Sequence, residues 1–311
     1  MKVVSFTPSK ISLWGGGTDL EPYCSKYGGL VINFAINIRQ KTILYTEDDI
    51  WERNTPNEFP YEADPQFYYH ITKHFGLNGQ HVFKIKSEFD GNIMSGLGSS
   101  GSAAVCLIGA INKLKGLNLS LEQIAQKAYE LENSFGIRTG TQDHLAATYG
   151  GFNLFSIKKD INIKLQSIYN PPFISSLVLF YTGHSRNSSK LQHNFDNLSK
   201  ERIDTLNQIK ELAGEAELLL RSEDIEKIGK LLDKAWELKK QSNKVSTPEI
   251  DRIYKKGMDN GAWGGKLLGA GGGGYMVFSV NPKIRQKFIQ NMDMEEIDFS
   301  LDNQGLDVRI L

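Results

Sequence analysis

The sequence predicts a two-lobed α+β protein. Strand-like alternation dominates its first half, long amphipathic helices dominate its second half, and the two do not alternate as regular βαβ units. A chain of 311 residues is long for one hydrophobic core, so two domains are expected. The best boundary mark is the pair Pro171-Pro172. We therefore predict an N-terminal domain at residues 1–170 and a C-terminal domain at residues 171–311.

Strand and helix signals follow one another through the first half. The clearest strand is Leu30–Ile38, where Ile32, Phe34, Ile36 and Ile38 share one face. Further strands are expected at Thr42–Tyr45 and Val82–Ile85. Helices are expected at four places: Phe67–Phe75, Ser102–Leu114, Leu121–Ser134 and Gln142–Tyr149. The third is opened by the capping box of Ser120 and Gln123, and the other three are closed by a glycine.

The second half reads mainly as helices around a few strands. Leu177–Tyr181 is an apolar run that indicates a buried strand. Three amphipathic helices are expected next, through Ile203–Leu212, through Ile225–Ala235 and from Pro248 to Asn260. The remaining elements are a strand, a glycine turn, a strand at Tyr275–Val280, a helix opened by Pro282, and terminal strands near Ile297–Leu301 and Leu306–Ile310.

Composition excludes several classes of protein. The 36 basic and 36 acidic residues cancel, and no segment is a basic run, so neither nucleic acid nor an anionic membrane is expected as a partner. No apolar run approaches the ~20 residues of a membrane span. The two cysteines, Cys24 and Cys106, lack metal-ligand spacing and fit a reducing compartment. We predict a cytoplasmic protein and leave its oligomeric state open, with a homodimer among the alternatives.

The most informative motif is Ser95–Gly101, with the sequence SGLGSSG directly before an expected helix. Its glycines allow positive φ and let a ligand approach the backbone. The first N–H groups of a helix lack internal partners, and the helix dipole adds partial positive charge. The motif therefore predicts a phosphate cradle and, with it, a nucleotide-dependent phosphotransferase. A glycine turn whose serines cap the helix is the alternative structural interpretation.

Other known glycine-rich motifs agree less well with this segment and its surroundings. Gly96, Gly98 and Gly101 also spell GxGxxG, the dinucleotide fingerprint, which would imply an NAD-dependent oxidoreductase. That fingerprint needs an acidic residue at the end of the next strand, and Glu122 falls within an expected helix instead. The chain has no GxxxxGK[ST] motif and no HRD or DFG element. These absences disfavour a P-loop enzyme and a protein kinase.

Two acidic residues are candidates for chemistry. Glu132 lies on the apolar stripe that Leu121, Ala125 and Ala128 define, so its carboxylate needs a cationic partner there. A divalent metal would serve, and pairing with Arg138 or contact with water is the alternative. Asp143 falls in the first turn of an expected helix, where an acid can simply complement the dipole. It can also serve as the base that deprotonates an acceptor hydroxyl.

Lys10 is a candidate to neutralise Asp143 or a transferring phosphoryl group. It stands in the segment Thr7–Asp19, in which three consecutive glycines and Asp19 follow within nine residues. A lone lysine is usually a solvated surface charge, but this setting is unusual for one.

Taken together, these motifs resemble the GHMP kinases. Pro8-x-Lys10-Ile11, Gly15–Asp19, Ser95–Gly101, Gln142-Asp143 and Lys266–Gly274 occur in the order of that superfamily, over nearly the whole chain. The resemblance is greatest to its heptose-phosphate kinases, which phosphorylate the anomeric hydroxyl of D-glycero-D-manno-heptose 7-phosphate. It implies an N-terminal lobe like the ribosomal-protein-S5 domain 2, a ferredoxin-like C-terminal lobe, and an active site between them.

The resemblance also implies roles for residues. Asp143 would be the base, assisted by Lys10, and Ser100 and Glu132 would hold Mg²⁺. The ATP phosphates would contact Ser95, Gly96, Leu97, Gly98, Ser99, Ser100 and Gly101. The sugar would contact Gly17, Thr18 and Asp19, with Gly271 and Gly272 in the turn that flanks nucleotide and substrate. In this family arginine usually stands where this chain has Lys10, so the charge is kept without the bidentate fork.

A sugar phosphate needs a separate site for its own dianion. Tyr181–Ser188 supplies a strand end, a glycine and Arg186 before an expected helix, so we predict that Arg186 binds that phosphate. The predicted activity is ATP- and Mg²⁺-dependent phosphorylation of a sugar phosphate. A kinase of fucose or galactose is the first alternative. An oxidoreductase and a non-catalytic sugar-binding relative are further ones.

Overall fold

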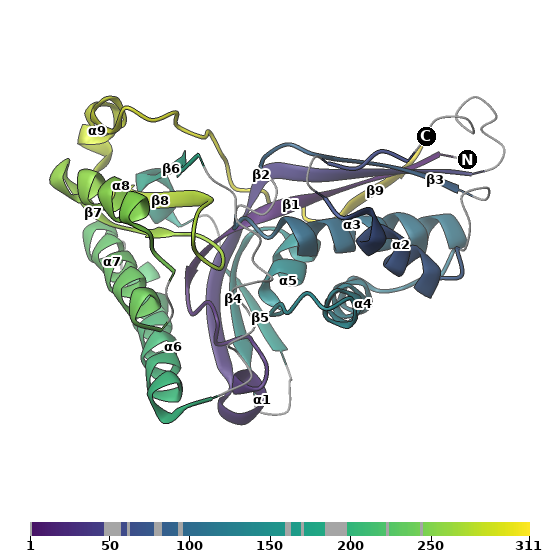
Figure 1. Ribbon diagram of the computed structural model, residues 1–311, viewed down its shortest axis with the longest axis horizontal. Helices are drawn as coiled ribbons and strands as arrows, with labels where there is room; N and C mark the ends of the chain where they lie inside the picture. Colours follow the sequence, from purple (N-terminus) through teal and green to yellow (C-terminus); the bar gives the residue numbers. More distant parts are fainter. Residues whose placement is uncertain are drawn as a thin grey trace.

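The computed structural model describes residues 2–46, 57–60, 63–77, 83–92, 96–158, 163–168, 171–183, 198–221, 224–242 and 245–311. It confirms the two-lobed α+β arrangement, with one antiparallel sheet in each lobe (Figure 1). Among the described helices, none is both long and apolar enough to cross a membrane.

The N-terminal lobe is built on a six-stranded sheet in the order β5-β4-β2-β1-β9, with β3 also paired to β2. Strand β2 is long enough to pair with β4 along its first part and with β3 along its last part. The strands are β1 (Lys2–Trp14), β2 (Gly29–Thr46), β3 (Phe83–Phe89), β4 (Phe152–Ile157), β5 (Ile163–Ile168) and β9 (Asp307–Ile310).

Helices cover this sheet and form the core of the lobe with it. Besides α1 (Tyr23–Tyr27), they are α2 (Pro65–His74), α3 (Ser99–Lys115), α4 (Leu121–Ser134) and α5 (Gln142–Tyr149). Helix α3 is the central one: every side chain from Ser102 to Ile111 is buried, among them Cys106. Figure 1 shows α3, α4 and α5 gathered below the long strands. This packing fixes where α3 and α5 begin, and the site is built at those helix starts.

The C-terminal lobe packs helices on a three-stranded sheet, β6-β8-β7. Its strands are β6 (Leu177–Tyr181), β7 (Ala262–Leu267) and β8 (Tyr275–Val280), and its longer helices are α6 (Lys200–Leu220), α7 (Ile225–Ser242), α8 (Pro248–Asp259) and α9 (Arg285–Met292). Short 3-10 turns lie at Pro172–Ser176 and Pro282–Ile284. Leu212 of α6 and Leu231 of α7 share one apolar cluster with Trp14 and Phe34 of the other lobe, so the lobes have a common core.

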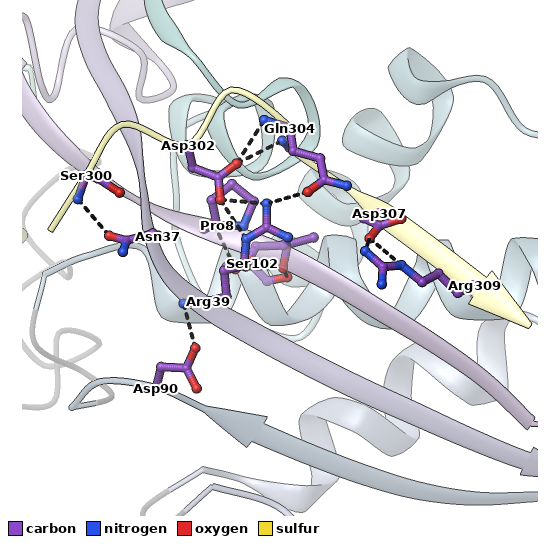
Figure 2. A network of polar contacts seen from close by, with 12 residues as sticks. Pro8, Asn37, Arg39, Asp90, Ser102, Ser300, Asp302, Gln304, Asp307 and Arg309 are labelled. Atoms are coloured by element: carbon purple, nitrogen blue, oxygen red, sulfur yellow. Dashed lines mark hydrogen bonds and ion pairs between the residues drawn. The ribbon is translucent and has the colours of Figure 1, made fainter. Parts of the chain in front are cut away.

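The C-terminal segment returns to the N-terminal lobe. Strand β9 pairs with β1, and the amide of Leu311 donates to the carbonyl of Lys2, so both chain ends lie together (Figure 1). Figure 2 shows the contacts that fasten this segment: Arg39 Nε donates to Asp302 at 2.6 Å, and Asn37 Oδ1 accepts from the amide of Ser300 at 2.8 Å. The predicted domain of residues 171–311 is therefore not confined to one lobe.

One predicted strand is absent. Residues 297–301 form only an isolated bridge between Leu301 and Ile36, next to one between Glu296 and Phe180. The apolar alternation of Ile297, Phe299 and Leu301 reflects packing onto the shared core rather than pairing with a sheet. The prediction of a strand there was wrong because an unpaired segment that buries every second side chain has the same two-residue period as a strand.

Candidate active site

Two cavities meet between the lobes. The larger has a volume of about 400 Å³ and is lined by the glycine-rich turn before α3, by aromatic side chains of the N-terminal lobe and by residues 268–271 of the C-terminal lobe. The smaller has a volume of about 180 Å³ and lies between the Gly16–Leu20 segment and helices α6 and α7. Five residues line both cavities and so form their junction: Lys10, Thr139, Asp143, Gly269 and Ala270. After the roles that the sequence predicts for their linings, we call the larger the nucleotide cavity and the smaller the acceptor cavity.

The glycine-rich turn delivers the start of α3 to the nucleotide cavity. The helix begins after Gly98, which adopts a left-handed conformation with φ of 77° and has no side chain to cap the helix. Gly98, Ser99 and Ser100 all line the cavity. The first turn of a 17-residue helix thus faces the cavity, and such a turn offers N–H groups and partial positive charge to an anion. The arrangement suits a phosphate.

Asp143 packs directly on this turn. A Cβ added at Gly98 would lie 3.0 Å from the Asp143 carboxyl carbon, and one added at Gly101 would lie 2.9 Å from the Asp143 Cβ. Real Cβ atoms essentially never come as close as 2.9 Å, and 3.0 Å is tighter than nine in ten real Cβ contacts. The two glycines therefore leave room for the aspartate, which is in the first turn of α5 as predicted. The glycine-rich turn and the carboxylate of Asp143 belong to one site.

Lys10 forms an ion pair with that carboxylate beside the same turn. Its Nζ lies 3.1 Å from Oδ1 of Asp143, and the two side chains are 6% and 20% exposed. Lys10 is placed by β1, and its amide donates to the carbonyl of Leu97 in the glycine-rich turn at 3.0 Å. The predicted neutralisation of Asp143 by Lys10 is what the structure has. A cation and a carboxylate at the junction of two cavities can act on a group passing between them.

The two glycine-rich segments touch each other across the lobes. A Cβ on Gly269 would lie 2.4 Å from the Cα of Gly96, and a Cβ on Gly96 would lie 2.7 Å from the backbone of Leu268. Gly269 also has a φ of 67°. Glycine is required at both positions because the backbones lie too close for any side chain. The contact joins the lobes beside the junction.

Glu132 is placed against His144 instead of a cavity. Both side chains are essentially fully buried, and Nε2 of His144 lies 2.6 Å from Oε2 of Glu132. Oε1 of Glu132 accepts no hydrogen bond from any described residue. The expected position on the apolar stripe is thus correct, while Arg138, the predicted structural partner, is replaced by His144. Within the described part of the chain, no three His, Cys, Asp or Glu side chains converge as a metal site.

The Gly15–Asp19 segment contributes unequally to the acceptor cavity. Gly17 and Asp19 line it, and Asp19 accepts hydrogen bonds from the amide of Gly17 and from Gln142. Burial, followed by the nearby Asp143 charge, raises the pKa of Asp19. Thr18 is fully buried, and its hydroxyl donates to the carbonyl of Gly15 at 2.8 Å and accepts from the amide of Leu30. Thr18 therefore shapes the segment and does not face the cavity.

The other predicted site residues divide in the same way. Gly96 and Gly271 line the nucleotide cavity, whereas Leu97, Gly101 and Gly272 line neither cavity. Leu97 is fully buried in the shared core. Gly271 lies in the turn between β7 and β8 and lines the larger cavity, and its contact with a substrate stays a prediction. Ser95 and Arg186 lie outside the described residues.

Sequence reasoning missed most of the cavity walls. On the nucleotide side these include Phe67, Tyr68 and Phe135. On the acceptor side they include Arg202, Lys239 and Lys266. A signal existed for one of them: Lys239 continues the apolar stripe of Ile228, Leu232 and Ala235, as Glu132 continues its own. The aromatic residues carried no such signal because their periodicity is that of ordinary core positions.

Comparison with known proteins agrees with this geometry. The model of the GHMP kinase N-terminal domain matches residues 66–151, and that of the GHMP kinase C-terminal domain matches residues 216–292. The chain belongs to the GHMP kinases, and it is a small-molecule kinase. The resemblance inferred from the motifs is confirmed, and the dinucleotide-dependent alternative is excluded.

Individual relatives refine the comparison. The D-glycero-alpha-D-manno-heptose 7-phosphate kinase of Campylobacter jejuni is 31% identical over 96% of this chain and 96% of its own. The galactokinase of Pyrococcus furiosus is 30% identical over 65% of this chain and 66% of its own. The crystal structure of a D-glycero-D-manno-heptose 1-phosphate kinase from Bacteriodes thetaiotaomicron superposes with a TM-score of 0.78 over 99% of both chains. At 23% identity, that superposition establishes the fold alone.

Proposed function

We propose that this kinase transfers the γ-phosphoryl group of ATP to the anomeric hydroxyl of a sugar phosphate, D-glycero-D-manno-heptose 7-phosphate, for the synthesis of nucleotide-activated heptose. The observation that carries the proposal is the junction of two cavities at the Lys10–Asp143 pair. A donor nucleotide in one cavity and an acceptor in the other would meet at this pair. The similarity to the Campylobacter jejuni heptose 7-phosphate kinase supports the choice of acceptor.

On the donor side, ATP would lie along the nucleotide cavity. Its phosphates would bind the backbone of the Gly96–Ser100 turn and the start of α3, for the electrostatic reasons given above. Its base would lie toward Phe67, Tyr68 and Phe135, the aromatic part of the same wall. Phe67 and Phe135 already contact each other, with ring centroids 5.5 Å apart.

At the junction, Asp143 would accept the proton of the anomeric hydroxyl. The hydroxyl oxygen then forms a bond to the γ-phosphorus while the bond from that phosphorus to the bridging oxygen breaks, and ADP leaves with the electron pair. Lys10 would offset negative charge on the transferring group. In reactions of this kind, positioning and charge stabilisation supply most of the catalysis. The close packing of Gly98 and Gly101 on Asp143 supplies that positioning.

We further propose that Mg²⁺ accompanies ATP and that Ser100 and Glu132 hold it. The chemistry of these residues fits, since Mg²⁺ takes oxygen ligands and is usually bound by one or two carboxylates together with substrate phosphates. Ser100 lines the nucleotide cavity, and Oε1 of Glu132 is a buried oxygen without a hydrogen bond among the described residues. When bound, the metal would neutralise phosphate charge. The contact of Glu132 with His144 provides a competing role for this carboxylate.

A kinase of an unphosphorylated sugar is the second candidate, because a galactokinase matches two thirds of the chain at 30% identity. The deciding experiment measures ADP release with D-glycero-D-manno-heptose 7-phosphate, the same heptose without phosphate, galactose and fucose. The highest kcat/KM for the heptose 7-phosphate, with a 1,7-bisphosphate product by ³¹P NMR, is the expected result. A higher kcat/KM for any unphosphorylated sugar would refute the proposed acceptor.

We also propose that the protein works in the cytoplasm, where ATP is available and free thiols persist. Cys24 and Cys106 are both free and buried.

A further inference from the structure

The acceptor cavity is lined by more cations than carboxylates. Lys10, Arg202, Lys239 and Lys266 reach it from β1, α6, α7 and β7, whereas Asp19 and Asp143 are its carboxylates. Among the described residues, the lining has four positive and two negative side chains, a formal balance of +2. Such a concave site attracts an anion.

The two carboxylates contact groups other than Lys239 and Lys266. Asp143 pairs with Lys10 at 3.1 Å, and Asp19 is held by the amides of Gly17 and Gln142. Nζ of Lys266 instead donates to the carbonyl of Leu13 at 2.7 Å, and no described carboxylate lies within 4.0 Å of it. Nζ of Lys239 donates to the carbonyls of Leu267 and Gly269 at 2.8 and 2.5 Å. The carbonyl of Leu13 orients the ammonium group of Lys266 but brings no full negative charge to it.

This arrangement is costly for the protein without an anion. Lys266 is only 6% exposed, and burial, with the charge of Lys10, lowers its pKa to about 7. Burial lowers the pKa of Lys239 as well, with the charges of Lys266 and Lys10 adding to the effect. Lysine is almost never buried unless it is paired, and strongly perturbed groups in a cleft mark functional sites. A bound dianion would supply the missing charge.

We propose that Lys239 and Lys266, together with Arg202, form the subsite that binds the phosphate group carried by the acceptor. The inference rests on the proposed function, because it assumes a phosphorylated acceptor. It assigns the phosphate to residues that line the acceptor cavity only. Of the four cations, Lys10 alone also lines the nucleotide cavity. These three side chains come from both layers of the C-terminal lobe, α6, α7 and β7, so this lobe would select the acceptor.

The test compares two acceptors, D-glycero-D-manno-heptose 7-phosphate and the same heptose without phosphate. Lys239→Gln and Lys266→Met should each lower kcat/KM for the phosphorylated acceptor about 10- to 100-fold, the usual range for a lost charged hydrogen bond. They should change kcat/KM for the unphosphorylated heptose and KM for ATP less than about threefold. Lys230→Gln, in an exposed ion pair with Glu226 on the outer side of α7, is the matched control and should change neither.

A purely structural role for Lys266 is conceivable, since its bond to Leu13 joins the two lobes. Lys266→Arg keeps the charge and should retain the preference for the phosphorylated acceptor. A second readout is proton uptake on binding, measured at pH 8 by calorimetry in buffers of different ionisation enthalpy. Wild type should take up protons when the heptose 7-phosphate binds, because the dianion raises the lowered pKa values of Lys266 and Lys239. Lys266→Arg should reduce that uptake by the share of Lys266, since arginine stays protonated. The other charged residues that line this cavity are unchanged in the variant: Lys10, Lys239, Arg202, Asp19 and Asp143.

The outcomes distinguish a failure of the proposed acceptor from a failure of the proposed phosphate subsite. If wild type prefers the unphosphorylated heptose, the proposed acceptor is wrong, and the subsite with it. If wild type prefers the phosphorylated acceptor but the variants lose activity equally with both, the proposed function stands and the subsite is refuted. A rise in KM for ATP alone would move the lysines to the nucleotide and would likewise refute the subsite.

Discussion

Replacing Asp143 by asparagine removes one charge from the junction and changes almost nothing else. Asparagine has the same shape, which matters because Gly98 and Gly101 leave no room for a larger side chain beside it. The phosphate cradle should therefore keep its geometry, and KM for ATP should change less than about threefold. Turnover should fall at least about 100-fold, which is the usual scale of a lost general base and corresponds to about 2.7 kcal/mol in activation free energy.

The same substitution has a predictable effect on stability. Lys10 is 6% exposed and would lose its carboxylate partner at 3.1 Å, with Lys266 close enough to repel it. Asp143 is 20% exposed, so solvent screens part of the interaction. We expect a loss of about 1–3 kcal/mol in the free energy of unfolding, measured by urea denaturation. Asp224→Asn is the control, because this exposed residue accepts from the amide of Lys227 before α7 and asparagine caps a helix start equally well.

The assay is steady-state ADP release with both substrates varied, alongside ATP binding measured by calorimetry. Turnover within threefold of wild type would refute the role of Asp143 as base and would leave Lys10 as the main group at the junction. A loss of ATP affinity that equals the loss of turnover would show that Asp143 acts on nucleotide binding. Only a selective fall in turnover agrees with proton abstraction.

Four further predictions concern single residues. Glu132→Gln should raise the Mg²⁺ concentration needed for half-maximal activity, and an unchanged Mg²⁺ titration would assign Glu132 to the contact with His144 alone. Gly269→Ala should destabilise the protein by about 1–3 kcal/mol because its Cβ would meet Gly96, whereas Gly116→Ala, also at positive φ but in open space, should cost less in urea denaturation. Arg186→Ala should weaken use of a sugar phosphate far more than ATP binding, and equal effects on phosphorylated and unphosphorylated sugars would remove Arg186 from acceptor recognition. The pKa of Lys266, about 7, lies below that of a lysine in the unfolded chain, so above pH 7 the unfolded chain binds more protons than the folded protein does. The free energy of unfolding should therefore rise from pH 7 to 8.5. Lys266→Met should flatten that rise, and an unchanged slope would contradict the lowered pKa.

Elements with a complete local signal were predicted well from the sequence. Helix α4 spans Leu121–Ser134 as expected, and its capping box is formed by both Ser120 and Gln123. Helix α5 and strand β6 also have the predicted bounds. In each case the start signal, the apolar period and the stop signal lie within a few residues of one another. Nothing distant is needed to define such a segment.

Elements whose partners are distant were predicted poorly. Strand β1 was missed because Pro8 and several serines and threonines interrupt its apolar pattern, although these side chains are buried against neighbouring elements. Thr7, for example, bonds to Ser102 of α3 at 2.8 Å. Leu30–Ile38 and Thr42–Tyr45 were predicted as two strands but are one, β2, in which buried Gln40 bonds to Ser87. Polar residues satisfied by long-range partners cannot be distinguished from surface residues in a single sequence.

The same distinction separates the parts of the site. The importance of the glycine-rich turn, Asp143 and Lys10, which the structure brings together, could be inferred because each stands in an unusual local context. The convergence of Lys239 and Lys266 was not, because α7 and β7 approach β1 only when the lobes dock. That docking depends on the contact between Gly96 and Gly269 and on the shared core around Trp14. The N-terminal lobe therefore carries the phosphate turn, Lys10 and Asp143, while the C-terminal lobe contributes the cations and depends on packing to place them. A change at the lobe interface should for this reason alter the use of the acceptor, and a change at Gly269 should also disturb the glycine-rich turn through its contact with Gly96.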